Sequence, residues 1–294
     1  MTSRRSSHPD PMAIGPTLVR WGERTFVVGI LNITPDSFSG DGLLGGGDPV
    51  ERAVAQARQM VEEGADLLDI GGESTRPGHA QVEATEETER VVPVVRAVRA
   101  ALPATPLSID TTKPAVAEAA LAAGADLLND IWGTGVDPAM VELAADRRVP
   151  ILLMHNREVA HYDDVVSEVT ADLGRAIDRA VGLGVDESAI LVDPGIGFGK
   201  TADHNVTLLR GLAALVSLGR PILLGTSRKS TLGRILDLPA DQRLEATLAT
   251  TALGIAAGVD LVRVHDVQAN VRAARVADAI IRGTWLADPE GGPR

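Results

Sequence analysis

Cysteine is absent from the 294-residue chain. Its absence excludes disulfide bonds, thiolate metal sites and cysteine nucleophiles. Long apolar runs are absent as well: the longest have the length of a strand, so we predict no transmembrane helix and no membrane partner. The N-terminal segment, residues 1–16, contains arginine but no apolar core. We therefore expect no signal peptide there and predict a cytoplasmic location.

The charge balance is acidic, with a formal net charge of −12 at pH 7. This balance argues against nucleic acid as a partner, because phosphate backbones need a basic surface. A small anionic ligand remains compatible, since it needs only a local cluster of cations. Lysine and phenylalanine are scarce, with three residues of each. The places where these rare residues fall are therefore informative.

Eight short apolar segments alternate with segments that have helical periodicity. Their polar ends fall near residues 31, 70, 110, 130, 154, 193, 225 and 265. A strand that alternates with a helix eight times in a chain of this length predicts the α/β class and a (β/α)8 TIM barrel. A doubly wound open sheet is the alternative, which the eight units and the near-continuous apolar strands disfavour.

The boundaries follow from composition. We expect residues 1–16 to form a disordered tail, residues 17–284 a single barrel, and residues 285–294 a flexible tail. A short hairpin over residues 17–27 is predicted before the first barrel strand, at the bottom of the barrel. Three predicted helices end at glycine, which adopts the left-handed conformation that stops a helix; these are Gly64, Gly124 and Gly258.

Cationic side chains gather where the predicted strands end, which is the active-site face of a (β/α)8 barrel. Arg263 and His265 alternate with valines on the last strand, so both project from one face. Together with Arg76 and Lys229 in other loops, Arg263 favours an anionic substrate such as a phosphate or pyrophosphate ester. A structural ion pair with a neighbouring aspartate is the alternative for Arg263.

Acidic and amide side chains end other strands, at Asp110, Asn129 and Asp193. Buried carboxylates need hydrogen-bond donors, which the guanidine-like edge of a heterocycle would supply. Capping of the following helix is the alternative for Asp110, and a turn role is the alternative for Asp193. The segment GIGFGKT at residues 195–201 is not a phosphate loop, because Pro194 stands where that motif needs its first glycine.

Seven segments in this order resemble the dihydropteroate synthases of folate biosynthesis: GILNITPDSFSGDG, DIGGESTRPG, SIDTTKP, NDI, DPGIGFGK, TSRKS and RVHDV. The resemblance runs from about residue 20 to residue 283. It implies a homodimeric (β/α)8 transferase that joins 6-hydroxymethyl-7,8-dihydropterin diphosphate to p-aminobenzoate. The products are 7,8-dihydropteroate and pyrophosphate, and sulfonamides compete with p-aminobenzoate. One departure is the short segment NREVAHYDDVV after LLMH, which lies in a peripheral loop.

The resemblance also implies roles for individual residues. It makes Asn32 a ligand of Mg²⁺ beside the diphosphate. It gives two flap loops their substrate contacts, which are Asp36, Phe38, Thr75, Arg76 and Pro77. The pterin pocket resembles that of the family at Asp110, Asn129, Ile131, Met154, Asp193 and Lys229. The diphosphate anchor corresponds to Arg263 and His265, and the p-aminobenzoate wall to Gly197, Phe198 and Ser227.

The implied reaction is dissociative, of the SN1 type, so it needs no protein nucleophile. The residues expected to act in it are Asp110, Asp193, Lys229, Arg263 and His265. A methyltetrahydrofolate-binding relative on the same barrel is the main alternative, although it would not need Asn32, the STRPG segment or the Arg263–His265 pair. A paralogue that binds pterins without turnover is the non-catalytic alternative.

Overall fold

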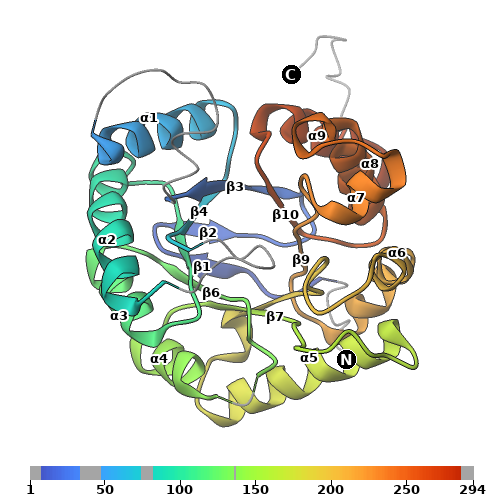
Figure 1. The fold of residues 1–294 in the computed structure, drawn as a ribbon, viewed down its shortest axis with the longest axis horizontal. Helices are drawn as coiled ribbons and strands as arrows, with labels where there is room; N and C mark the ends of the chain where they lie inside the picture. The colour runs from blue at the N-terminus through green and yellow to red at the C-terminus, as the bar shows by residue number, and fades with distance from the viewer. Residues whose placement is uncertain (1–7, 34–47, 74–81, 136, 286–294) are drawn as a thin grey trace, which may run out of the picture.

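The computed structural model describes residues 8–33, 48–73, 82–135 and 137–285 (Figure 1). Each of the eight predicted apolar segments forms a parallel strand: β3 (Phe26–Asn32), β4 (Leu67–Gly71), β5 (Leu107–Asp110), β6 (Leu127–Asp130), β7 (Ile151–Met154), β8 (Ile190–Asp193), β9 (Leu223–Leu224) and β10 (Leu261–Val264). They form one sheet in the order β8-β7-β6-β5-β4-β3-β10-β9. A parallel bridge between Val192 and Ile222 joins its two ends, which confirms the predicted barrel.

Helices surround the strands (Figure 1): α1 (Pro49–Glu62), α2 (Ala84–Ala101), α3 (Pro114–Ala123), α4 (Ala139–Arg147), α5 (Val165–Gly182), α6 (Ala202–Arg210), α7 (Ser230–Leu236), α8 (Leu244–Ala256) and α9 (Val267–Ile281). Short 3-10 helices are η2 (Glu187–Ala189), η3 (Leu212–Leu218) and η4 (Ala240–Gln242). The glycines predicted to end helices have φ angles of 104°, 117° and 100° at Gly64, Gly124 and Gly258. Among the helices of the described ranges, none is long and apolar enough to cross a membrane.

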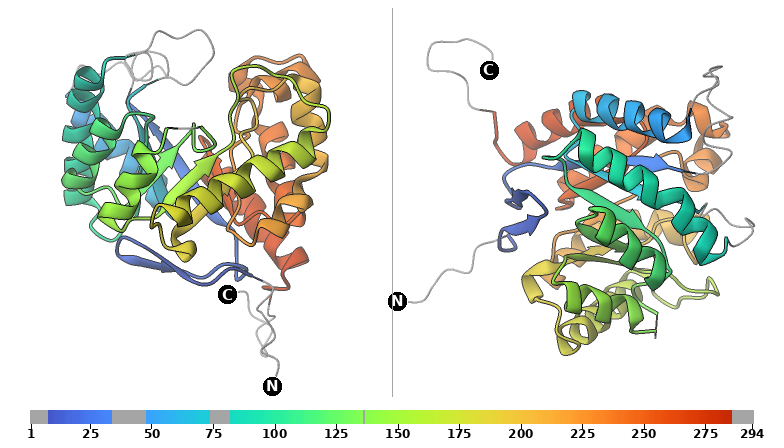
Figure 2. Two further views of the ribbon diagram at one scale, coloured as in Figure 1. Left: turned by 90° about the horizontal axis from the view of Figure 1, so that it is seen from below. Right: turned by 90° about the vertical axis from the view of Figure 1, so that its left-hand side faces the viewer.

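The N-terminal hairpin starts earlier than predicted. Strands β1 (Met12–Ile14) and β2 (Thr17–Val19) pair antiparallel, so residues 12–16 are not part of a disordered tail and the hairpin does not span 17–27. Its turn is Gly15-Pro16, a composition that resembles a tail when read from sequence alone. The hairpin lies across one end of the barrel (Figure 2). Residues 1–7 and 286–294 lie outside the described part of the chain.

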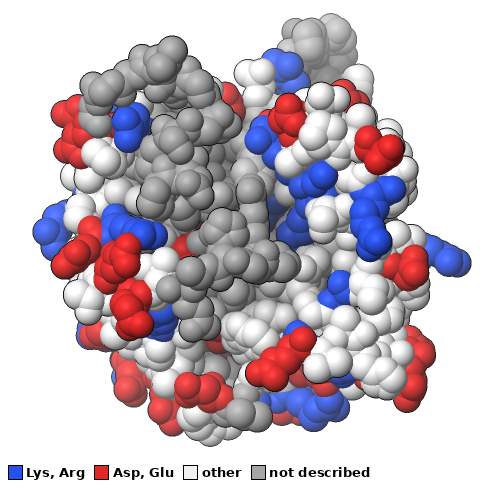
Figure 3. Space-filling view, in the orientation of Figure 1, with Lys and Arg blue, Asp and Glu red and all other residues white. Residues whose placement is uncertain are grey.

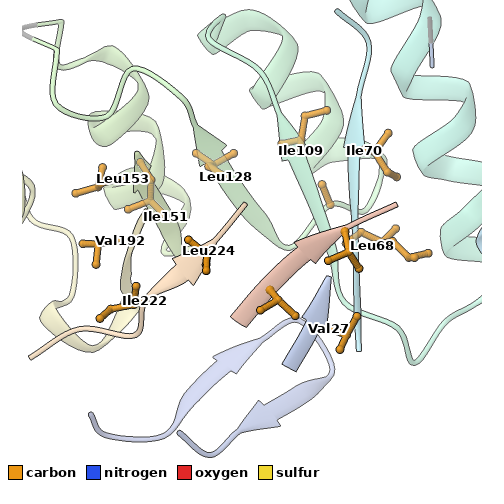
Figure 4. Packing of buried hydrophobic residues seen from close by; sticks show 14 of the residues in the cluster. Val27, Leu68, Ile70, Ile109, Leu128, Ile151, Leu153, Val192, Ile222 and Leu224 are labelled. Carbon is orange, nitrogen blue, oxygen red and sulfur yellow. The ribbon is translucent and has the colours of Figure 1, made fainter. Parts of the chain in front are cut away.

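Alternate strand residues point to opposite faces, and this alternation gives the barrel two apolar cores. Outward side chains such as Leu68, Ile109 and Leu153 pack against the helices (Figure 4). Inward side chains from the beginnings of the strands pack against the hairpin, through Met12, Ile14, Val19 and Trp21. They form an apolar floor: Phe26, Val28, Leu67, Leu127, Leu152, Leu191, Leu223 and Leu261.

Candidate active site

Polar side chains occupy the next inward-facing positions along the strands, toward their carboxyl ends from this apolar floor. Register places Ser108 beside Asp69 and Asp110 beside Asn129. Since paired residues of neighbouring parallel strands point to the same face, these four side chains share the barrel interior. All four are buried. A polar layer therefore lies directly on an apolar one, at the end of the barrel opposite the hairpin.

Arg263 lies at the centre of this layer. Its Nε donates to Asp69 Oδ2 at 2.5 Å, and one Nη donates to Asp110 Oδ2 at 2.7 Å. The structural ion pair considered for Arg263 is therefore confirmed, with two carboxylates instead of one. Asp69 also accepts hydrogen bonds from Ser108 Oγ at 2.5 Å and Asn129 Nδ2 at 3.1 Å. Asp69 thus has its acceptors occupied by three donors.

Asp110 differs from Asp69 because one of its oxygens is unused. Its Oδ1 is buried and has no hydrogen-bond partner within the described ranges. Such an oxygen is costly unless a donor arrives. Burial raises the pKa of Asp110 to about 7, and the nearby Arg263 opposes that effect. Asp110 does not cap the next helix, since α3 follows Lys113 and has no side-chain cap.

Asp193, Lys229 and Arg263 border one space beside Gly225. A Cβ at position 225 would lie 3.7 Å from Asp193 Oδ2, 3.8 Å from Lys229 Nζ and 3.9 Å from Arg263 Cβ. A side chain there would be in van der Waals contact with all three, so these residues converge around Gly225. Asp193 Oδ1 accepts the Gly195 N–H at 2.7 Å, which confirms the turn role, and Oδ2 is the oxygen that lies beside Gly225.

Lys229 also contacts the loop after β8. Its Nζ donates to the Ile196 carbonyl and lies 4.6 Å from the centre of the Phe198 ring. Burial lowers the pKa of Lys229 to about 8, while the nearby Asp193 opposes that effect. Gly197 has a φ of 85°, and a Cβ there would lie 3.1 Å from Lys229 Cδ. The lysine thus joins the carboxylate side of the site to the aromatic side.

His265 and Ser227 lie together on the next part of the rim. Ser227 Oγ and His265 Nδ1 are 3.0 Å apart, and Ser227 Oγ accepts the His265 backbone N–H at 3.1 Å. Basic residues also flank α7 nearby, and Figure 3 shows Lys and Arg side chains gathered on that part of the face. Basic side chains therefore gather on this part of the rim among acidic ones (Figure 3), and Arg228 is paired there with Asp266.

The apolar residues predicted at the site are buried. Met154 ends β7 and pairs in register with Asp193, and Ile131 directly follows β6. Contacts and strand register thus join Asp110, Asn129, Asp193, Lys229 and Arg263, with Met154, Gly197 and Phe198 beside them. Ser227 and His265 form a separate pair, and Asn32 ends β3 and is partly buried. The predicted flap residues lie outside the described ranges; they are Asp36, Phe38, Thr75, Arg76 and Pro77.

Sequence reasoning missed Asp69. The residue binds both Arg263 and Asn129, yet it sits within an apolar strand and not at its polar end. A signal was present: Asp69 is two residues before Gly71, which pairs with Asp110, so strand alternation places Asp69 on the inward face. A charge at an inward position of a buried strand requires a partner.

Comparison with known proteins identifies the family to which this sequence is similar. The family model described as pterin binding enzyme matches residues 28–265. Dihydropteroate synthase from Bacillus subtilis (strain 168) is 47% identical over 266 residues, covering 90% of this chain and 92% of that protein. These matches span the whole barrel, from its first strand to its last.

Solved structures agree. Dihydropteroate synthase from Xanthomonas albilineans with 4-aminobenzoic acid superposes with a TM-score of 0.86 at 44% identity, covering 92% of this chain and 98% of that one. The same enzyme in complex with 7,8-dihydropteroate gives a TM-score of 0.83 at 42% identity, with coverage of 92% and 98%. Fold, buried polar layer and sequence identity agree, and the chain belongs to the dihydropteroate synthases of the pterin-binding enzyme family.

Proposed function

We propose that this chain condenses 6-hydroxymethyl-7,8-dihydropterin diphosphate with p-aminobenzoate, releasing 7,8-dihydropteroate and pyrophosphate for folate biosynthesis. The observation that carries the proposal is the convergence of Asp193, Lys229 and Arg263 around Gly225. Acceptors and donors at one end of a closed barrel suit a ligand with a donor-rich heterocycle and an anionic leaving group. The family membership gives the reaction.

The pterin edge is assigned to the buried acids. Within the described ranges Asp110 Oδ1 has no hydrogen-bond partner, and Asp193 Oδ2 lies beside Gly225, so we assign the ring N–H and amino groups to these two oxygens. Asn129 adds a further polar group, and Lys229 donates to the pterin carbonyl and ring nitrogen. Ile131 and Met154 supply apolar walls. These oxygens would then gain the donors that buried carboxylates need.

The diphosphate is assigned to the basic side chains of the rim. The Arg263 guanidinium has five N–H donors. Within the described ranges two of them donate to carboxylates, those of Asp69 and Asp110. We assign the remaining Arg263 N–H groups and His265 to the anion. Arg76 is a proposed third contact. Phe198, Gly197 and Ser227 are assigned to p-aminobenzoate, and Thr75, Pro77, Asp36 and Phe38 to the two flaps.

Asn32 fits a Mg²⁺ ion that takes most of its ligands from elsewhere. Among the described residues there is no cluster of three or more His, Asp or Glu side chains able to hold a metal. Mg²⁺ is commonly bound by one or two protein oxygens together with phosphate oxygens and water. The Asn32 amide oxygen would hold it, and the ion would neutralise charge on the diphosphate.

The proposed reaction begins with cleavage of the bond between the pterin methylene and the diphosphate oxygen, whose electron pair leaves with pyrophosphate. Arg263 and His265 stabilise that leaving group. Positive charge spreads into the electron-rich ring, where Asp110 and Asp193 provide negative potential. The neutral arylamine then attacks the methylene and loses a proton. This SN1 order requires binding and charge stabilisation from the protein but no nucleophile.

Pyrophosphate release tests the function. With the pterin diphosphate and p-aminobenzoate both present, we expect steady release matched by formation of dihydropteroate. Without p-aminobenzoate, sustained release should be largely lost. Tight binding of the pterin diphosphate without turnover would favour the non-catalytic alternative, and methyl transfer from methyltetrahydrofolate would favour the other relative.

Removal of Mg²⁺ is expected to lower kcat by at least about 100-fold, because the diphosphate loses a cation that offsets charge in the transition state. The measurement is turnover in excess chelator, followed by readdition of Mg²⁺. Asn32→Ala should raise the Mg²⁺ concentration needed for half-maximal rate. A full rate in chelator would contradict the metal assignment.

The affinity for the pterin should be highest near neutral pH and should fall at both lower and higher pH. The ionised carboxylate of Asp110 accepts hydrogen bonds more strongly than the protonated form, so affinity should rise as pH passes through its pKa of about 7. Lys229 must be protonated to donate a third N–H, so affinity should fall above its pKa of about 8. Titration calorimetry with 6-hydroxymethyl-7,8-dihydropterin, which has no phosphate to titrate, checks this from about pH 5.5 to about pH 9.5. Asp110→Asn should remove the acidic limb; a flat wild-type profile would contradict it.

We also propose the homodimer that the family resemblance implies. Three large apolar residues on the neighbouring helices α8 and α9 support it, since Leu253, Val276 and Ile280 are 69%, 62% and 75% exposed. Val276 and Ile280 are one helical turn apart on α9, so they share a face. Sedimentation should give the mass of two chains, and Ile280→Glu should shift it to one. An unchanged mass would contradict this interface. The cytoplasmic location stays a prediction, as does competition by sulfonamides.

A further inference from the structure

Lys200 lies at the rim, and neither the sequence nor the family comparison gives it a role. It ends the loop of residues 194–200 and folds back beneath it. Its Nζ donates to the Gly195 carbonyl and the Phe198 carbonyl, each at 3.0 Å, and lies 2.9 Å from His155 Nδ1. A protonated lysine has three N–H donors. The His155 carbonyl lies 3.4 Å from the same Nζ, so four acceptors surround the amine, and burial lowers the pKa of Lys200 to about 7.

His155 is held ready for this contact from behind. It is fully buried, and its Nε2 lies 3.0 Å from Asp172 Oδ2 on α5. A carboxylate at Nε2 favours the tautomer that carries its proton there and leaves Nδ1 as an acceptor for Lys200. Burial lowers the pKa of His155 to about 4, so the ring is neutral at pH 7. Arg157 also donates to Asp172 Oδ2, at 2.7 Å.

The loop itself is held closely against the segment after β7. A Cβ on Gly195 would collide with the His155 carbonyl, and a Cβ on Gly199 would collide with the Arg157 carbonyl. Both glycines also have positive φ angles, of 67° and 53°, which other residues adopt with strain. Tyr162 Oη donates to the Gly199 carbonyl at 2.9 Å. The outer side of the loop is therefore bound along its length.

The inner side of the same loop faces the active site. The Ile196 carbonyl accepts from Lys229, and the Phe198 ring packs beside Lys229 Nζ. The Gly197 N–H donates to Asn205 Oδ1 at 2.8 Å. Lys200 binds the carbonyls on either side of Ile196 and Gly197, those of Gly195 and Phe198. Contacts therefore run without a gap from Asp172, through His155 and Lys200, to the loop and Lys229.

We propose that Lys200, oriented by His155 and Asp172, is a positioning residue that fixes the Phe198 wall for p-aminobenzoate. The inference rests on the proposed placement of that substrate beside Phe198. Lys200 touches neither substrate in this scheme. It acts by holding the loop carbonyls so that Phe198 keeps its place beside Lys229 before p-aminobenzoate binds, which lowers the ordering cost of binding.

Lys200→Met tests the proposal by removing the three donors and keeping an unbranched apolar side chain. We expect KM for p-aminobenzoate to rise about tenfold or more, because a wall that must be ordered on binding weakens the contact. KM for the pterin diphosphate should rise less, by under about threefold, since Asp110 and Asn129 are held through Arg263 and Asp69 outside the loop, while Asp193 and Lys229 contact it through the Gly195 N–H and the Ile196 carbonyl. His155→Phe should shift KM for p-aminobenzoate in the same direction but less.

A double-mutant cycle with Phe198→Ala separates positioning from general destabilisation. If Lys200 acts through Phe198, adding Lys200→Met to Phe198→Ala should cause little further rise in KM for p-aminobenzoate. Arg99→Met is the matched control, because Arg99 donates to the carbonyls of Gly124 and Thr105 away from this loop. It should lower the melting temperature and leave both KM values unchanged.

Each outcome has a separate reading. Equal rises in both KM values, or full additivity with Phe198→Ala, would overturn the positioning role even if Lys200→Met unfolds at lower temperature. An unchanged KM for p-aminobenzoate would overturn it as well. A wild-type protein that forms no dihydropteroate would instead overturn the proposed function, which the same assay detects before any variant is made.

Discussion

Lys229→Ala is expected to lower kcat/KM for the pterin diphosphate about 1,000-fold or more, which corresponds to about 4 kcal/mol of lost transition-state stabilisation. Lys229 is the buried cation beside Asp193 and the Ile196 carbonyl, and it borders the space next to Gly225. Without it the pterin loses a charged donor, and Asp193 loses a neighbouring positive charge that favours its ionised form. Steady-state kinetics at saturating p-aminobenzoate measures the effect.

Circular dichroism and thermal melting control for misfolding of Lys229→Ala. Lys229 precedes α7 without capping it through its side chain, so the fold should remain. Lys229→Arg is the charge-conserving comparison: it keeps the cation but places a bulkier group in the same space, and it should recover little activity. A Lys229→Ala protein with the wild-type rate would show that the pterin is bound elsewhere.

Arg263→Met is expected to damage both stability and activity. It would leave Asp69 and Asp110 buried without their guanidinium, a change that typically costs about 3–5 kcal/mol of folding free energy. The diphosphate would lose its proposed anchor as well, so kcat/KM should fall by about 1,000-fold or more. Denaturant unfolding and pyrophosphate release measure the two effects on the same sample.

The double variant Arg263→Met/Asp69→Asn separates the loss of stability from the loss of activity. Removing a charge together with its partner is far less costly than removing one alone, so the double variant should regain part of the lost stability. Its activity should stay as low as that of Arg263→Met, because the anion anchor is still missing. Recovery of turnover along with stability would mean that Arg263 serves only the fold.

The barrel was predictable because its signals are local. Each strand is a short apolar run that ends in a polar residue or is followed by one within two positions, and glycines such as Gly64 and Gly124 stop the preceding helices in the left-handed conformation. The site followed from the same pattern, since parallel strands present their carboxyl ends at one edge. Asp110, Asp193 and Arg263 converge there for that reason.

The parts that were missed depend on contacts between distant segments. The hairpin strand Met12–Ile14 is three residues long, and only its burial under the barrel floor distinguishes it from a tail. Asp69 lies within a strand, so its role appears once Arg263 reaches it across the interior. Lys200 and His155 are 45 positions apart, and nothing in either local sequence predicts that they meet.

Crystallography of the protein with the pterin diphosphate and Mg²⁺ examines the proposed site as a whole. We predict the pterin edge within hydrogen-bond distance of Asp110 Oδ1 and Asp193 Oδ2, with Lys229 on its carbonyl and the diphosphate against Arg263 and His265. A pterin bound away from these carboxylates, or a diphosphate that makes no contact with Arg263, would contradict the proposed reaction site.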